Sequence, residues 1–470
     1  MSGKGYFMET LDRINDFVNS IVWGWPTMIL LVGTGVFLTI LLRGIQFRHL
    51  GECIRTTVSR KSSSAGSGEV TPFQAFATAL AGTVGTGNIV GCSGAIIAGG
   101  PGAVFWLWVS GLFGMATKYS EVLLAIRYRR RNQHNERVGG PMFYIEEGLG
   151  RKWKWLAVFF AFAGAFAAFG IGCLSQVSSV VSAIRMSINA FSPLSAETEK
   201  TVALTVGILT AAVLALVIIG GLKRIGKFAA SVSPFMSIIY LVFALVVIFT
   251  NLGSVGTVLK NIFACAFDPK AVLGAAVGLS MKQAMSSGIG RGLFSNEAGQ
   301  GSAPIAHAGT EEEVPARQGM AGVFEVFFDT IVICTITCLA VLMSGVPVEY
   351  VTGDKNVLPI IAFSSVFGDR IGSVTVAVSL VLFAFTTMVS WSLYGVRCFE
   401  YLLKTDKYSV WYRVLFVVVV AYGATVPLGL AYRISDTLNG LMAIPNIIAL
   451  LALSRIIVEE TKKEFPEDWK

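Results

Sequence analysis

Long apolar stretches separated by short polar segments recur along the whole chain of 470 residues. A helix of about 20 apolar residues is long enough to cross the hydrocarbon core of a bilayer. By this criterion we predict eleven spans, at residues 21–43, 72–98, 101–127, 153–189, 199–220, 227–250, 272–308, 317–345, 371–402, 409–430 and 433–456. The pattern therefore predicts an all-α polytopic membrane protein.

Two of these spans, the second and the seventh, are interrupted by glycine. The second contains AGTVGTGNIVG (81–91) and the seventh contains SSGIGRGLFSNEAGQG (286–301). Because glycine costs about 1 kcal/mol relative to alanine inside a helix, we expect both helices to be broken there. Non-helical backbone at membrane depth survives only where it is buried in protein or lines a cavity. Two such breaks in corresponding positions indicate the binding site of a secondary transporter.

The positions of the breaks also predict the architecture. They lie five spans apart, in spans that enter the membrane from opposite sides, so we expect an inverted five-plus-five repeat of spans 2–6 and 7–11. The predicted division is 1–70 for an extra N-terminal transmembrane helix and a cytoplasmic loop, 71–250 and 251–456 for the two repeats, and 457–470 for a cytoplasmic tail. This arrangement resembles the leucine-transporter (LeuT) type of fold.

Composition and charge agree with a membrane protein. The chain is 54% hydrophobic and 14% charged, whereas soluble domains carry about 25% charged residues. The net charge of +8 comes from Lys and Arg in loops between spans, so we expect a lipid bilayer and no nucleic acid as partner. The basic loops after spans 1, 3 and 5 predict an external N-terminus, a cytoplasmic C-terminus and a possible external lid at 346–370. Seven cysteines, mostly in apolar stretches, favour neither a disulfide framework nor a zinc site.

The ends of the broken helices predict the chemistry of the site. Where the first half of span 2 stops, near Gly82, Thr83 and Val84, unpaired carbonyl groups favour a cation. Where its second half starts, N–H groups favour a carboxylate, and the residues concerned are Gly85, Thr86, Gly87 and Asn88. A zwitterionic amino acid with a coupling Na⁺ fits this arrangement. We expect span 7 to repeat it and to admit only a small side chain, at Ser286, Ser287, Gly288, Ile289 and Gly290.

Four motifs carry a family resemblance. In order, they are TPFQAFATALAGTVGTGNIVG (71–91), GGPGAVFWLWVSGLFG (99–114), GGPMFYIEEGLG (139–150) and RGLFSNEAGQGSAPIAHA (291–308). Together they resemble the alanine or glycine:cation symporter family. The resemblance implies Na⁺-coupled uptake of alanine or glycine across a prokaryotic plasma membrane by alternating access. Leu107, Cys173 and Gly290 stand where the family usually has Met, Asn and Ala, which leaves the substrate range open.

The resembling fold also suggests positions for the cation sites. One Na⁺ is expected between carbonyls near Gly82 and Val84 and the hydroxyls of Thr386 and Thr387 on span 9, because hard cations prefer oxygen ligands. Alternatively, these hydroxyls bond to their own helix. Asn88 either completes a second cation site beside the substrate or caps the second half-helix.

Polar and aromatic residues on span 4 are further candidates for the pocket. Gln176 either binds the substrate or ties helices together. Phe169 either walls the pocket or packs in the core.

Charged residues in spans 7 and 8 have a different expected role. Arg291 is expected to pair with Glu297, or with Asp329, as a structural pair or an inner gate.

Other function classes are less consistent with the sequence. It has no ring of charged residues or filter motif of a channel, and no motif for an intramembrane enzyme, so we expect no catalytic residues. A proton-coupled transporter is the main alternative, disfavoured because no lone carboxylate lies at the breaks. A sensor that binds amino acids without transport also stays open. Accumulation driven by a Na⁺ gradient separates a symporter from both a channel and a sensor.

Overall fold

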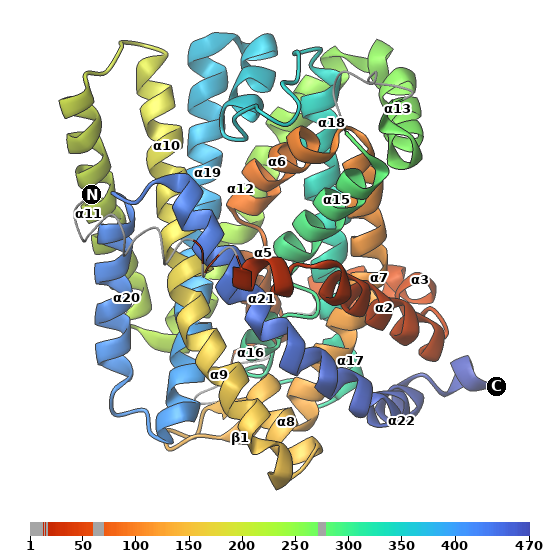
Figure 1. Ribbon diagram of the computed structural model, residues 1–470. Helices are drawn as coiled ribbons and strands as arrows, with labels where there is room; N and C mark the ends of the chain where they lie inside the picture. The colour runs from red at the N-terminus through yellow and green to blue at the C-terminus, as the bar shows by residue number, and fades with distance from the viewer. Residues whose placement is uncertain (1–12, 14, 16, 60–69, 271–278) are drawn as a thin grey trace.

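The computed structural model describes residues 13, 15, 17–59, 70–270 and 279–470, and most of them are helical. Tilted helices form a bundle in which α5, α6, α15 and α21 lie near the centre (Figure 1). The main helices are α2 (Trp25–Leu41), α3 (Ile45–Arg48), α4 (Leu50–Ser59), α5 (Pro72–Thr83), α6 (Val90–Gly99), α7 (Gly102–Arg127), α8 (Pro141–Gly148), α9 (Lys154–Phe169), α10 (Ser175–Asn189), α11 (Ala196–Ile218), α12 (Gly221–Thr250), α13 (Val255–Phe267), α15 (Met281–Asn296), α16 (Ala303–His307), α17 (Pro315–Val326), α18 (Thr335–Met343), α19 (Val357–Leu403), α20 (Ser409–Gly423), α21 (Leu428–Ala452) and α22 (Ser454–Glu464).

Within the described ranges, seven helices are long and apolar enough to cross a membrane, or eight if the bent pair α5 and α6 counts as one span. The protein is therefore a multi-helix membrane protein, but the predicted number of eleven spans and the inverted repeat are not confirmed. Part of the difference has simple causes. The predicted start of span 7, residues 272–278, lies outside the described residues, and α20 is an apolar helix of only 15 residues.

The predicted break in span 2 is confirmed. A capping box starts α5, in which Thr71 Oγ1 accepts from the Gln74 N–H and Gln74 Oε1 accepts from the Thr71 N–H. The helix ends at Thr83, and Val84 and Gly85 are extended. One 3₁₀ turn, η1 (Thr86–Asn88), then leads into α6, and the two halves are bent by 55°. The break therefore interrupts the regular hydrogen bonding of the helix at residues 84–88, and side chains of other helices bond to part of this backbone.

Span 7 is interrupted within the predicted stretch 286–301, but the expected break at Ser286–Gly290 is wrong. Helix α15 runs without interruption to Asn296 and ends at Glu297, which has a left-handed φ of 54°. Gly288 and Gly292 serve close packing on α7 instead, and a Cβ at Gly288 would lie 2.2 Å from the carbonyl oxygen of Ala103. Small residues one turn apart let helix backbones approach each other in membranes. The non-helical segment of span 7 is 297–302, between α15 and α16.

Two π-helical turns interrupt otherwise regular helices. The turn η3 (Gly170–Leu174) joins α9 to α10, and η6 (Phe327–Cys334) joins α17 to α18. In η3, a Cβ at Gly172 would lie 2.4 Å from Cβ of Trp391 on α19, so this residue must be small. Each π turn shifts the register of the side chains that follow it, and such turns are frequent at functional sites.

The segment 346–370 was predicted to be an external lid. Residues 357–367 are helical and continue into the long span of α19 through a kink at Gly368, whose φ is 78°. The preceding loop, 344–356, is held against α6 because the Val351 N–H donates to the carbonyl oxygen of Ile97 at 2.9 Å. The loop thus lies over the end of α6 (Figure 1).

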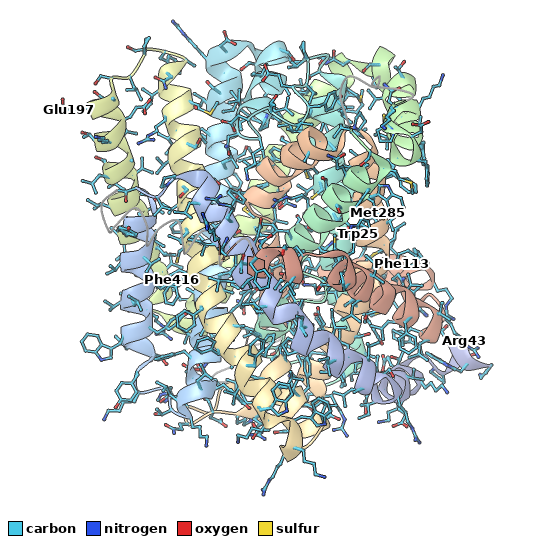
Figure 2. All side chains as sticks on the ribbon, viewed as in Figure 1. Trp25, Arg43, Phe113, Glu197, Met285 and Phe416 are labelled. Atoms are coloured by element: carbon cyan, nitrogen blue, oxygen red, sulfur yellow. The ribbon has the colours of Figure 1, made fainter. Side chains whose placement is uncertain are left out.

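Charged side chains lie mainly at the two ends and the periphery of the bundle. Figure 2 shows Arg43 and Glu197 on its edge, whereas Phe416 is buried between helices. At the end that carries the strands β1 (Arg130–Arg131) and β2 (Arg137–Val138), the C-terminal segment packs on the first helices. Asp468 there bonds with Arg48 at 2.7 Å and with His49 at 2.9 Å.

Replacing Gly288 with alanine should lower the stability of the bundle by about 1–3 kcal/mol, because the added Cβ would overlap backbone of α7. Gly290→Ala is the matched control, since a Cβ there meets no atom within 4 Å. The midpoint of thermal unfolding in detergent should fall for Gly288→Ala only. Equal midpoints for the two variants would contradict the close packing of α7 and α15.

Candidate functional site

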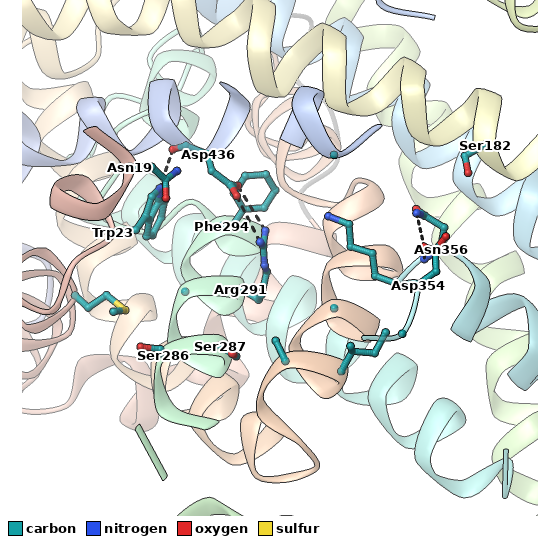
Figure 3. A pocket seen from close by; sticks show the side chains of 18 residues that line it. Asn19, Trp23, Ser182, Ser286, Ser287, Arg291, Phe294, Asp354, Asn356 and Asp436 are labelled. Atoms are coloured by element: carbon teal, nitrogen blue, oxygen red, sulfur yellow. Dashed lines mark hydrogen bonds and ion pairs between the residues drawn. The ribbon is translucent and has the colours of Figure 1, made fainter. Parts of the chain in front are cut away.

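A cavity of about 760 Å³ lies between α6, α15, α21 and the loop 344–356, and we call it the vestibule. Figure 3 shows Ser286, Ser287 and Arg291 of α15 on its wall, with Asp436 of α21 facing Arg291. Three of the predicted substrate residues, Ser286, Ser287 and Gly290, therefore line the vestibule. They do not lie at the break of span 2.

Phe294 separates the vestibule from this break. Its ring lines the vestibule, and it also lies 3.5 Å from the position that a Cβ of Gly87 would take. The ring centre of Tyr432 on α21 lies 6.4 Å from that of Phe294. The two rings form an aromatic layer between the vestibule and residues 85–88.

Below this layer, polar groups from three helices meet at Thr86. Its N–H and its hydroxyl donate to Gln176 Oε1 at 3.4 and 3.1 Å, and Thr86 Oγ1 accepts from the Tyr432 hydroxyl at 3.1 Å. The π turn η3 positions Gln176, because the carbonyl oxygen of Ile171 accepts from Gln176 Nε2 at 2.9 Å. The structure thus brings the predicted residues Thr86 and Gln176 together. Gln176 hydrogen-bonds to the break itself, which agrees with the second of its two predicted roles, a tie between helices.

Asn88 hydrogen-bonds both to the break and to η6. Its Oδ1 accepts from the Gly85 N–H at 2.8 Å, as the predicted cap would, and its Nδ2 donates to Asp329 Oδ1 at 2.6 Å. Asp329 also accepts from the hydroxyls of Ser295 at 3.0 Å and Thr330 at 2.8 Å. All of these side chains are buried. A carboxylate therefore lies at the break, contrary to the sequence argument that disfavoured proton coupling.

Ser295 and the position of Asp329 beside Asn88 were missed by sequence reasoning. Asp329 lies in an apolar stretch and was expected to pair with Arg291. An isolated acidic residue in a membrane span is a functional candidate by default, and this signal was available. Its orientation toward Asn88 was not, because it depends on the π turn η6.

The predicted cation ligands on α19 behave differently from one another. Thr387 Oγ1 donates to its own helix, at the carbonyl oxygen of Phe383, at 2.9 Å, and it also lies 3.5 Å from the carbonyl oxygen of Val84. A Cβ at Gly85 would lie 2.5 Å from this hydroxyl. Thr386 instead faces α12, where it contacts Met236 at 3.3 Å, and bonds to its own helix. The hydroxyl of Thr83 likewise bonds only to its own helix, and Gly82 packs on Tyr394. Only Thr387 and Val84 are thus brought together as predicted.

The predicted ion pairs of Arg291 are not formed. Arg291 Nη2 lies 3.4 Å from Asp436 Oδ2, across the vestibule wall. Glu297 accepts from the Trp391 indole N–H at 2.9 Å and bonds with the hydroxyl of Ser302. These contacts join the end of α15 to α19 and to the start of α16. Arg291 lies more than one turn earlier on α15 and takes no part in them.

Three further predicted pocket residues lie away from the break. The ring of Phe169 packs on Tyr412 at 5.1 Å, in the core near α20. Gly288 packs on α7, and Ile289 belongs to an apolar cluster with Met28 and Leu31. Because span 7 breaks two turns later than predicted, the part of α15 that touches the break is Phe294–Ser295.

The chemistry at the break suits a hard cation. Oxygen donors from Val84, Thr387, Asn88, Ser295 and Asp329 lie around residues 84–88, and hard cations prefer such oxygens. Among the described residues, no three His, Cys, Asp or Glu side chains group as a transition-metal site would require.

A family model described as the sodium:alanine symporter family matches residues 8–468. The chain belongs to this family. The sodium/alanine symporter AgcS of Methanococcus maripaludis is 43% identical over 457 residues, which cover 97% of both chains. An uncharacterized transporter of Haemophilus influenzae is 42% identical, covering 97% of this chain and 96% of the relative. A probable sodium/glutamine symporter, GlnT of Bacillus subtilis, is 34% identical over 97% of this chain and 91% of its own.

The fold of this symporter family member is also found among solved structures. The structure of MhsT in complex with L-phenylalanine matches with a TM-score of 0.57, covering 86% of this chain and 100% of MhsT. At 14% identity, this match shows the leucine-transporter-like fold alone.

Replacing Asn88 with alanine should destabilise the protein by about 1–3 kcal/mol, because it leaves the buried Gly85 N–H without a partner and removes one of the hydrogen bonds of Asp329. Thr83→Val is the matched control in the same segment, since the Thr83 hydroxyl bonds only to its own helix. The thermal unfolding midpoint in detergent should fall for Asn88→Ala and change little for Thr83→Val. A wild-type midpoint for Asn88→Ala would contradict the structural role of this amide.

Proposed function

We propose that this protein is a Na⁺-coupled symporter that takes up small amino acids, alanine or glycine, by alternating access. The observation that carries the proposal is the break in the second span, where buried oxygen donors and backbone N–H groups surround residues 84–88. Family membership supports Na⁺ coupling, and a sodium/alanine symporter is 43% identical over nearly the whole chain.

Two groups of oxygens are the proposed ligands of Na⁺. The first consists of the Val84 carbonyl and the Thr387 hydroxyl, which already approach each other at 3.5 Å. The second consists of Asn88, Ser295 and Asp329, where the carboxylate supplies the negative charge that a desolvated cation needs. Na⁺ bound at either place would hold the unwound segment of span 2 against α19 or η6.

The amino acid is proposed to bind beside Thr86, between the break and the aromatic layer. Its carboxylate would meet the N–H groups where η1 starts, displacing Asn88 Oδ1 from the Gly85 N–H and Gln176 Oε1 from the Thr86 N–H. Gly85 packs on Thr387, and Gly87 packs on Phe294, so the space beside the break is narrow. This supports a substrate with a small side chain.

The vestibule is proposed to face the outside. The basic loops predict this orientation through the positive-inside rule, with the N-terminus outside and the C-terminus in the cytoplasm of a prokaryotic cell. Opening and closing of the aromatic layer of Phe294 and Tyr432 would then connect the break to the vestibule. The predicted division into repeats at 71–250 and 251–456 remains part of this proposal.

The direct test is uptake of radiolabelled alanine into liposomes that contain the purified protein. An inward Na⁺ gradient should drive accumulation above equilibrium, and unlabelled glycine should compete whereas leucine should not. Accumulation driven only by a proton gradient would replace Na⁺ coupling with the alternative of proton coupling, which Asp329 at the break makes chemically reasonable. Binding without any uptake would indicate a sensor and contradict transport.

Thr387→Ala should raise the Na⁺ concentration for half-maximal alanine uptake by about tenfold, because one oxygen ligand beside Val84 is lost. Thr386→Ala is the matched control on the same helix, since its hydroxyl faces Met236. The Na⁺ dependence of initial uptake rates measures both variants. An unchanged Na⁺ dependence in Thr387→Ala would remove α19 from the cation site.

A further inference from the structure

Lys355 on the loop 344–356 reaches into the vestibule. Its aliphatic stem crosses α6 at Gly94, because Cδ of Lys355 lies 3.4 Å from the position that a Cβ of Gly94 would take. The loop itself is fastened to α6 by the hydrogen bond from the Val351 N–H to Ile97. The side chain therefore has a defined path from the loop toward the centre of the bundle.

The ammonium group of Lys355 contacts the aromatic layer. Its Nζ lies 3.6 Å from the centre of the Tyr432 ring, in the position of a cation–π contact. The hydroxyl of the same tyrosine donates to Thr86 in the break. Only the ring of Tyr432 thus lies between Lys355 and the proposed amino-acid site.

The other charges in the vestibule have partners. Arg291 of α15 pairs with Asp436 of α21, and Asp354 Oδ1 accepts two hydrogen bonds from Asn356, each at 2.8 Å. These three charged groups and Tyr432 are the titratable and charged groups that face Lys355 from the helices and the loop around it. Lys355 forms no ion pair or hydrogen bond with any described residue. A half-buried cation that forms no ion pair favours an anion at this place.

We propose that Lys355 forms an outer subsite that binds the carboxylate of an incoming amino acid in the vestibule before the amino acid reaches the break. This inference rests on the proposed function. A carboxylate is common to all amino acids, so the subsite recruits substrates of any size, whereas the narrow space at Gly85 and Gly87 selects the small ones. A charge in a recessed, low-dielectric cleft concentrates an oppositely charged ligand there.

The charge of Lys355 changes within an accessible pH range. Burial, reinforced by Arg291, lowers the pKa of Lys355 from its ordinary value to about 8, against the opposing effects of Asp436 and Asp354. The ammonium is therefore present below pH 8 and is lost as the external pH rises through 8. Carboxylate binding at the outer subsite should weaken over the same interval.

The test measures the KM for alanine in liposomes at external pH 7 and 9, with the Na⁺ gradient and the internal pH held constant. In the wild type, KM should rise about tenfold from pH 7 to 9 with little change in kcat, because a hydrogen bond to a charged group is lost. In Lys355→Arg, KM should stay low at both values, since the guanidinium remains charged. In Lys355→Met, KM should be high at both values.

Lys282→Met is the matched control. Lys282 also makes a cation–π contact, over Trp25 at 5.7 Å, but it is exposed and does not line the vestibule. This variant should behave as the wild type.

A wild-type KM and pH profile in Lys355→Met would overturn the subsite and leave transport itself intact. If Lys355→Met is absent from the membrane, Lys355→Arg decides: a KM independent of pH supports the subsite, and a wild-type pH dependence overturns it. No uptake by the wild type would instead overturn the proposed function.

Discussion

The structure depends on which groups hydrogen-bond to the interrupted backbone of span 2. Water cannot hydrogen-bond to its N–H and C=O groups at membrane depth, so neighbouring helices must supply the hydrogen-bond partners. Asn88 binds the Gly85 N–H and also Asp329 of η6, Gln176 of α10 accepts from Thr86, and Thr387 of α19 approaches Val84. Helices distant in the sequence therefore converge on one turn of chain. The same groups that stabilise the break are those that a cation and a zwitterion require.

Above the break, the molecule has a second functional layer. Phe294 and Tyr432 separate residues 85–88 from the vestibule, and Tyr432 contacts Thr86 on one side and Lys355 on the other. In the proposed mechanism, selection by size belongs to the break and attraction by charge belongs to the vestibule. Keeping these tasks apart lets a narrow site receive a charged ligand without placing an unpaired cation inside it.

The sequence alone predicted the helical membrane fold and the break of span 2, because the glycines there coincide with Asn88, a residue that caps helices. It failed for span 7, since glycine also serves close helix packing, and Gly288 and Gly292 stand one turn apart on a face against α7. The partner of Arg291 could not be predicted, because Asp436 is 145 residues away. The position of Asp329 depends on a π turn, which leaves no simple pattern in the sequence.

The most direct measurement of the central claim is an experimental structure of the protein in lipid with Na⁺ and alanine bound. The account predicts density for the amino acid between residues 85–88 and 294–297, with its carboxylate on the N–H groups of the η1 turn. It also predicts density for an ion beside Asn88 and Asp329 or beside Val84 and Thr387. Alanine bound only along Ser286–Gly290 of α15, with residues 84–88 unliganded, would contradict the assignment of the break as the transport site.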